Sequence, residues 1–136
     1  MARDIVCTAI VVKDNKILLI KRSIDPESGQ WALPGGYLSW DETTEEGAIR
    51  EVKEETGVDV KVTKLLGVYS DPYRVRIEVL ENVAIVYIAE PVSDRAASAL
   101  DEVEKVEWVS LDAIPQNLAF DHNKIIEDYK RSLRLD

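Results

Sequence analysis

The chain has 136 residues and is 46% hydrophobic, which fits a single globular domain spanning residues 1–136. Its 26 acidic residues against 17 basic ones argue against broad binding of nucleic acid or of anionic membranes. The apolar stretches fall short of the roughly 18 residues needed to cross a bilayer, and the N-terminal residues run directly into a strand pattern rather than a secretory leader. We therefore expect a cytoplasmic protein.

The first third of the chain predicts a β-hairpin followed by a short strand. Residues 5–12 and 16–22 are rich in aliphatic and β-branched side chains, and the polar pair Asp14-Asn15 between them suits a tight turn. Cys7 lies within the first apolar run, so we expect it to pack as a small hydrophobic residue. Residues 31–36 form a brief apolar step that ends in a cluster of helix and strand breakers.

A helix is predicted at residues 43–56. Thr43 and Glu46 have the spacing of a capping box, and Gly57 is placed to end the helix in a left-handed conformation. Further strands are predicted at residues 60–70, 83–89 and 105–109, with residues 74–80 as a strand or an extension of the next one. Residues 91–99 are expected to form a loop, 111–114 a short helical turn, and 121–133 a final helix. Strands interrupted by two separate helices favour a mixed sheet covered by helices, an α/β (α+β) fold.

The predicted helix has one acidic face. At 100° per residue, Arg50, Glu51, Glu54 and Glu55 lie within an arc of about 140°, and apolar residues occupy the opposite side. Carboxylates this close repel one another. Most charged helix faces are simply solvated, but a hard divalent cation such as Mg²⁺ would also relieve the repulsion, and such a cation would reconcile an acidic site with a phosphorylated substrate.

The residues around this helix resemble the Nudix box. Gly36, five residues, Glu42, seven residues and then Arg50-Glu51-Val52-Lys53-Glu54-Glu55-Thr56-Gly57-Val58 match every specified position of that motif. The box covers residues 36–58. The resemblance implies the Nudix fold, with a mixed β-sheet between helices and a loop–helix–loop catalytic motif.

The resemblance also implies roles for these residues. Glu51, Glu54 and Glu55 would bind Mg²⁺, with Mn²⁺ as the alternative, and Gly36 would contribute its backbone to the metal shell. Arg50 would orient a ligating glutamate, and Glu42 would support the site. The reaction would be attack of a metal-activated water on a phosphorus atom of a pyrophosphate. The general base varies within the family. Glu102 and Glu104 are candidates for the base or for a further ligand, although a solvated loop is an equally good interpretation of each.

The substrate is read from weaker signals. Residues 65–72 and 118–122 are similar to segments of ADP-ribose pyrophosphatases, which implies cleavage of ADP-ribose or a related nucleoside diphosphate derivative to AMP and a phosphorylated group. The Pro-Arg-Gly turn that often follows in those enzymes is replaced by Tyr73-Arg74-Val75. Aromatic side chains could stack on a base and arginines could bind phosphate, although core packing is the simpler role for each ring. These candidates are Arg22, Trp31, Tyr37, Tyr69 and Arg74, with Tyr73, Arg76 and Phe120 as further ones.

Three functions are therefore weighed. The leading one is an ADP-ribose pyrophosphatase, the second is a pyrophosphatase of normal or oxidised nucleoside triphosphates, and the third is a non-catalytic nucleotide-binding module. Small Nudix proteins are often homodimers, so a homodimer is expected. His122, the only histidine, lies at the start of the last predicted helix and is expected to be exposed or to cap that helix.

Overall fold

A computed structural model describes residues 2–25, 27–74, 82–93 and 103–135 of the chain. Its elements are, in chain order, β1 (Asp4–Lys13), β2 (Lys16–Arg22), β3 (Trp31–Ala32), β4 (Gly35–Tyr37), α1 (Thr44–Thr56), β5 (Val60–Tyr69), β6 (Asn82–Pro91), β7 (Val103–Ser110) and α2 (His122–Leu135). These elements confirm the predicted hairpin, helices and principal strands. None of the described helices is long and apolar enough to cross a membrane.

Three other predicted segments have different outcomes. Most of segment 74–80 and most of the predicted loop 91–99 lie outside the described residues. Segment 111–114 forms a single hydrogen-bonded turn, in which the Ala113 N–H donates to the Ser110 carbonyl at 3.0 Å, in keeping with the predicted short helical turn.

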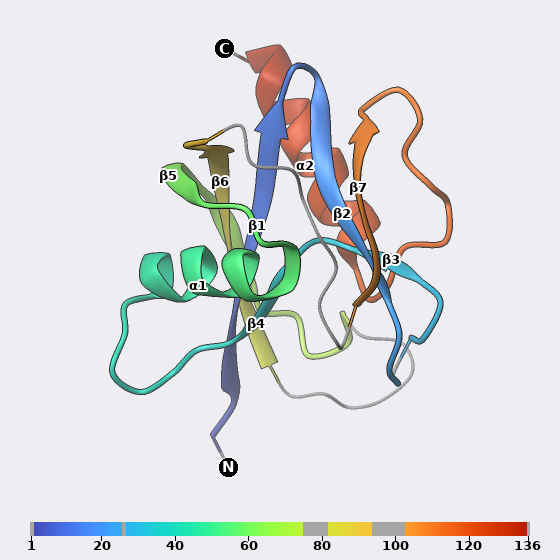
Figure 1. Ribbon diagram of the computed structural model, residues 1–136. Helices are drawn as coiled ribbons and strands as arrows, with labels where there is room; N and C mark the ends of the chain where they lie inside the picture. The colour runs from blue at the N-terminus through green and yellow to red at the C-terminus, as the bar shows by residue number, and fades with distance from the viewer. Residues whose placement is uncertain (1, 26, 75–81, 94–102, 136) are drawn as a thin grey trace.

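The sheet is built around β1, and five of its strands follow the order β3-β2-β1-β6-β5 (Figure 1). Strands β4 and β7 lie off this path, and β7 pairs with β2. The N-terminal half of β1 pairs with β4, and its C-terminal end pairs with β2. Strand β6 runs parallel to β1, whereas the other paired strands are antiparallel. The sheet is therefore mixed, as predicted.

The two helices cover opposite faces of this sheet (Figure 1). Successive side chains of a strand point to opposite faces. Ile10 of β1 accordingly packs in one cluster with Ile125 and Ile126 of α2, whereas Ala9 packs in another with Val52 of α1. This arrangement confirms the predicted sheet between helices.

Local sequence explains how the hairpin and α1 are positioned. Asp14 and Asn15 adopt φ values of 51° and 61°, the left-handed conformation that a two-residue hairpin turn requires. The Thr43 hydroxyl accepts from the Glu46 N–H, the Glu46 carboxylate accepts from the Thr43 N–H, and Gly57 ends α1 with φ 76°. Both predicted caps are confirmed. They determine where α1, the helix that carries the glutamates, begins and ends.

Cys7 of β1 is fully buried on the face of the sheet that α1 covers, and burial raises the pKa of its thiol to about 11. A thiol with so little tendency to ionise is a poor nucleophile and a poor metal ligand. The prediction of a packing role for Cys7 is confirmed.

Candidate active site

Strand β4 places a pair of glycines against β1, with Gly35 opposite Thr8 and Gly36 opposite Cys7. A Cβ at Gly35 would lie 2.6 Å from Thr8 Oγ1 and 2.7 Å from the Cys7 carbonyl oxygen, so a side chain would push the strands apart. A Cβ at Gly36 would lie 2.5 Å from the carboxyl carbon of Glu51. The missing side chain at Gly36 therefore makes room for a carboxylate of α1.

The guanidinium of Arg50 connects the carboxylates of this region. Its Nε and Nη2 donate to the two oxygens of Glu42 at 2.9 and 2.7 Å, a bidentate arrangement. Its Nη1 donates to Glu51 at 2.8 Å and to Glu54 at 3.1 Å, and Nη2 also donates to the Tyr37 carbonyl at 3.0 Å. One arginine thus joins the loop before α1 to two of the three glutamates on its acidic face.

The pKa values follow from this arrangement. The hydrogen bonds from Arg50 lower the pKa of Glu42 to about 2, with help from the Ser39 N–H, and the same pair raises the pKa of Arg50. Burial raises the pKa of Glu51, and the hydrogen bond from Arg50 only partly offsets this effect. Glu42 is therefore a stable anion, whereas the carboxylate of Glu51 lacks enough compensating positive charge.

The other two glutamates flank Glu51. The side chain of Glu54 is 57% exposed, and Glu55 accepts a hydrogen bond from the Gly35 N–H at 2.7 Å. In the described part of the chain, no three His, Cys, Asp or Glu side chains converge into a ready-made metal cage. The three carboxylates thus lie on one face of α1, where Glu51 and Glu54 accept from Arg50 and Glu55 accepts from Gly35.

This arrangement fits a hard divalent cation. Mg²⁺ is usually held by only a few carboxylates, with waters and substrate phosphates completing its shell, so it does not need a closed protein cage. The donors here are carboxylate oxygens, one of which is buried without full compensation, and the Gly36 backbone lies against it without an intervening side chain. A cation would supply the positive charge that Glu51 lacks.

A cavity of about 280 Å³ opens beside these groups. Gly35, Gly36 and Glu55 form one part of its wall. Arg22, Arg74, Asn82, Phe120 and His122 line other parts of it, and they come from β2, from the segment after β5, from β6 and from the start of α2. The cavity therefore joins Glu55 of the acidic face to a wall that carries two arginines, of which Arg74 is already paired with Asp121. A cationic wall of this kind suits a phosphorylated ligand.

Comparison with known proteins identifies the family. The chain matches the NUDIX domain over residues 2–129. The chain belongs to the Nudix hydrolase family. It is 48% identical over 123 residues to an ADP-ribose pyrophosphatase of Methanocaldococcus jannaschii, an alignment that covers 90% of this chain and 70% of the relative.

Solved structures agree with this assignment. A NUDIX hydrolase from Nitrosomonas europaea superposes with a TM-score of 0.84 at 30% identity, covering 98% of this chain and 72% of that one. The NUDIX domain of Shewanella oneidensis NrtR, crystallised with ADP ribose, superposes with a TM-score of 0.78 at 28% identity, covering 98% and 90% of the two chains. The chain is thus a Nudix hydrolase, an enzyme that acts on pyrophosphate bonds and belongs to a family that generally uses divalent cations such as Mg²⁺ or Mn²⁺.

The candidate substrate residues of this Nudix hydrolase occupy different places. Arg22, Tyr37 and Arg74 line the cavity beside the box, as does Phe120. Trp31 packs against the core on the α2 side of the sheet, and Tyr69 donates a hydrogen bond to Asp128 of α2 at 2.8 Å. A substrate role for each residue stays a prediction. Arg76 and Glu102 lie outside the described residues.

Other candidates have other surroundings. Tyr73 is exposed, and Glu104, the second residue of β7, lies beside Lys21, with 3.8 Å between their charged atoms. Glu104 remains a candidate base or ligand, but it lies within β7 rather than in a loop, and its pairing with Lys21 suits a surface position.

The expectation that His122 is exposed or capping is wrong in its first part. Its side chain is buried, and its Nδ1 accepts a hydrogen bond from the Leu33 N–H at 3.0 Å. The segment before α2 causes this burial, because the Trp31 N–H donates to the Asn117 carbonyl and the Ala119 N–H donates to the Trp31 carbonyl. These contacts, which link residues far apart in the sequence, bring the start of α2 against Leu33.

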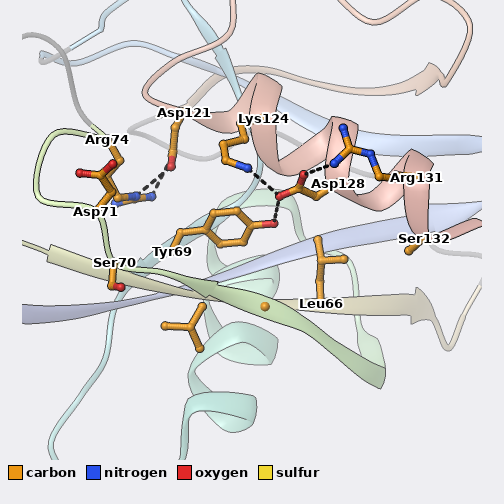
Figure 2. A pocket seen from close by; sticks show the side chains of 12 residues that line it. Leu66, Tyr69, Ser70, Asp71, Arg74, Asp121, Lys124, Asp128, Arg131 and Ser132 are labelled. Atoms are coloured by element: carbon orange, nitrogen blue, oxygen red, sulfur yellow. Dashed lines mark hydrogen bonds and ion pairs between the residues drawn. The ribbon is translucent and has the colours of Figure 1, made fainter.

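A larger groove of about 710 Å³ lies between β5 and α2 (Figure 2). Tyr69 and Lys124 both reach Asp128, which also lies near Arg131, and Arg74 pairs with Asp121 (Figure 2). Several charged side chains of the groove are therefore already paired with one another. The glutamates of the box do not line this groove. We therefore place the candidate active site at the smaller cavity, which adjoins Glu55 and Gly36.

Proposed function

We propose that this Nudix hydrolase cleaves the pyrophosphate bond of ADP-ribose, or of a related nucleoside diphosphate derivative, with Mg²⁺ as its metal. The products would be AMP, or the corresponding nucleoside monophosphate, and a phosphorylated group. The observation that carries the proposal is the cavity that runs from Glu55 and Gly36 to Arg22 and Arg74. The similarity to an ADP-ribose pyrophosphatase and to a domain crystallised with ADP ribose supports the choice of substrate.

In this proposal, Glu51, Glu54 and Glu55 hold the cation together with the backbone of Gly36. When bound there, a cation would supply a lowered pKa for a water molecule and positive charge beside the phosphate oxygens. Arg50 orients Glu51 and Glu54, as its hydrogen bonds to both indicate. Glu42 keeps Arg50 in place through the bidentate pair. The cavity beside the box would hold the remainder of the substrate.

A panel assay tests this function. Purified protein with Mg²⁺ is offered ADP-ribose, nucleotide sugars, dinucleotides and nucleoside triphosphates, and the products are identified by chromatography and mass spectrometry. We expect AMP and a sugar phosphate from ADP-ribose, and no turnover when Mg²⁺ is chelated. Release of pyrophosphate from triphosphates without any turnover of ADP-ribose would reject the proposal.

The second candidate is a pyrophosphatase of nucleoside triphosphates, which would release a nucleoside monophosphate and pyrophosphate. One feature favours it: the segment after Pro72 lacks the Pro-Arg-Gly turn. The same panel separates the two candidates, because pyrophosphate and a sugar phosphate are different second products.

We also propose that the enzyme is a cytoplasmic homodimer. The exposed apolar side chains of Leu65 and Val68 on the edge strand β5 support a contact between subunits there. Light scattering should then give twice the chain mass of 15.3 kDa. A mass of one chain at micromolar concentration would contradict the dimer, and fractionation of the source cells tests the location.

A further inference from the structure

His122 is buried at one wall of the cavity beside the box, and its environment fixes which ring nitrogen carries the proton. The Leu33 N–H donates to Nδ1 at 3.0 Å, so Nδ1 must be an unprotonated acceptor. The proton of the neutral ring therefore lies on Nε2. Burial lowers the pKa of His122 to about 3, with further lowering by the nearby charges of Arg74 and Arg22, so the ring is neutral at physiological pH.

The second nitrogen has a different environment. Among the described residues, no side chain or backbone group forms a hydrogen bond with Nε2 of His122. This nitrogen is nevertheless not sealed off from solvent. The ring lines the cavity that also touches Glu55 and Gly36. With Nδ1 occupied by the Leu33 N–H, the Nε2–H group is the polar group of the ring that remains for a ligand in this cavity.

The groups around the ring hold it in place. The Phe120 ring lies with its centroid 5.5 Å from that of His122, and the guanidinium of Arg22 lies 5.0 Å from the Phe120 centroid. Arg74 forms a two-bonded ion pair with Asp121, the residue before His122, with both distances at 2.9 Å. These contacts, together with the bond from Leu33, leave the ring little freedom to turn its donor elsewhere.

We propose that the Nε2–H group of His122 binds the substrate by donating a hydrogen bond to one of its oxygen atoms. The inference rests on the proposed function, because it requires the nucleoside diphosphate compound to occupy this cavity. A ligand that displaces water from this donor must offer an acceptor in its place, since an analogue that lacks the acceptor leaves the donor unpaired. His122 is therefore a specificity-determining residue as well as a link between α2 and Leu33.

Because the chain has a single histidine, nuclear magnetic resonance can observe this ring directly. Protein labelled with ¹⁵N at histidine is titrated with AMP, and with ADP-ribose in the presence of Ca²⁺ in place of Mg²⁺. We expect the free protein to show the Nε2–H tautomer throughout pH 5–8, and each ligand to shift the Nε2 and Hε2 signals. A protonated ring, the other tautomer, or unchanged signals at saturating ligand would overturn the inference.

Two substitutions separate substrate binding from packing. In His122→Asn the amide oxygen can replace Nδ1 as the acceptor for Leu33, but no donor remains at the position of Nε2. We expect a roughly tenfold higher KM with little change in Tm, the size of effect typical of one neutral hydrogen bond. In His122→Gln the amide can replace Nε2, so KM should stay near the wild-type value while Tm falls because Leu33 loses its acceptor. If KM stays at the wild-type value in both variants and only Tm falls, His122 acts in packing alone.

Assays of the wild-type enzyme separate a failure of the proposed function from a failure of the inference about His122. If it does not hydrolyse ADP-ribose, the proposed substrate is wrong, and the variants are compared on the best substrate of the panel. If it turns over a substrate and His122→Asn leaves KM unchanged, the inference about His122 fails while the function stands. If a variant does not fold, the spectra of the wild-type ring decide.

Discussion

Replacing Gly36 with alanine should disable the site by displacing one carboxylate. The added Cβ would lie 2.5 Å from the carboxyl carbon of Glu51 and 2.5 to 2.6 Å from its oxygens. Carbon atoms in contact normally lie about 3.5–4.0 Å apart, so the carboxylate must move by about 1 Å. The strand at Gly36 is tied to β1 opposite Cys7, so the side chain of Glu51 is the group that moves.

The size of the effect follows from this displacement. A misplacement of about 1 Å in a catalytic group costs about 100-fold in rate. Moving the carboxylate also stretches its 2.8 Å hydrogen bond from Arg50. A hydrogen bond to a charged group contributes about 1.5–3 kcal/mol, so Tm should fall by several degrees. We expect kcat to fall by about 100-fold and the folded structure to persist.

The assay is release of AMP from ADP-ribose with Mg²⁺, alongside thermal unfolding. Gly67→Ala is the matched control, because its Cβ would meet the Tyr69 ring at an ordinary 3.6 Å. Adding Glu51→Asp to Gly36→Ala shortens the displaced side chain, so Tm should recover while turnover stays low. A Gly36→Ala enzyme with kcat within twofold of the wild type would refute this account of Glu51.

Three further substitutions test the rest of the site. Glu55→Gln keeps an acceptor for the Gly35 N–H but loses the negative charge, so Tm should be nearly unchanged. Turnover with Mg²⁺ should fall by more than about 100-fold, which exceeds the loss typical of residues that only support a metal ligand. Near-normal turnover would exclude Glu55 as a ligand. Glu42→Gln removes the stability that the ion pair with Arg50 contributes. Because the folded pKa of Glu42, about 2, lies below the ordinary 4.5, the loss of stability relative to wild type should be complete above pH 4.5 and should shrink as the pH falls towards 2. A loss of stability that does not change with pH would argue against the pair. Thr43→Ala removes the cap of α1 and should cost about 1 kcal/mol of stability without loss of turnover, both measured on the same sample.

Most of the fold could be predicted because its signals are local. The aliphatic runs of β1 and β2 with Asp14-Asn15 between them, and the caps Thr43 and Gly57 of α1, are all contained within a few residues. The helical period places the glutamates of α1 on one face whatever the rest of the chain does. The box therefore identified both the family and the acidic face.

The cavity could not be predicted in the same way, because its wall comes from distant segments. The position of His122 depends on backbone hydrogen bonds between Trp31 and the segment before α2, and no periodicity in the sequence encodes that pairing. A histidine at the start of a helix is usually close to solvent, and here that expectation failed. The motif similarity at residues 118–122 was the one signal that pointed to this segment.

Arg74 illustrates why a residue type alone does not determine a role. From the sequence it is a cation suited to phosphate, yet in the fold its side chain is 7% exposed and bound to Asp121, with a further hydrogen bond to Asn82. Its charge still reaches the cavity, because it contributes to the low pKa of His122. Burial contributes more than Arg74 to that low pKa, so the role we assign to Arg74 is to fix Asp121, the residue before His122, through two hydrogen bonds.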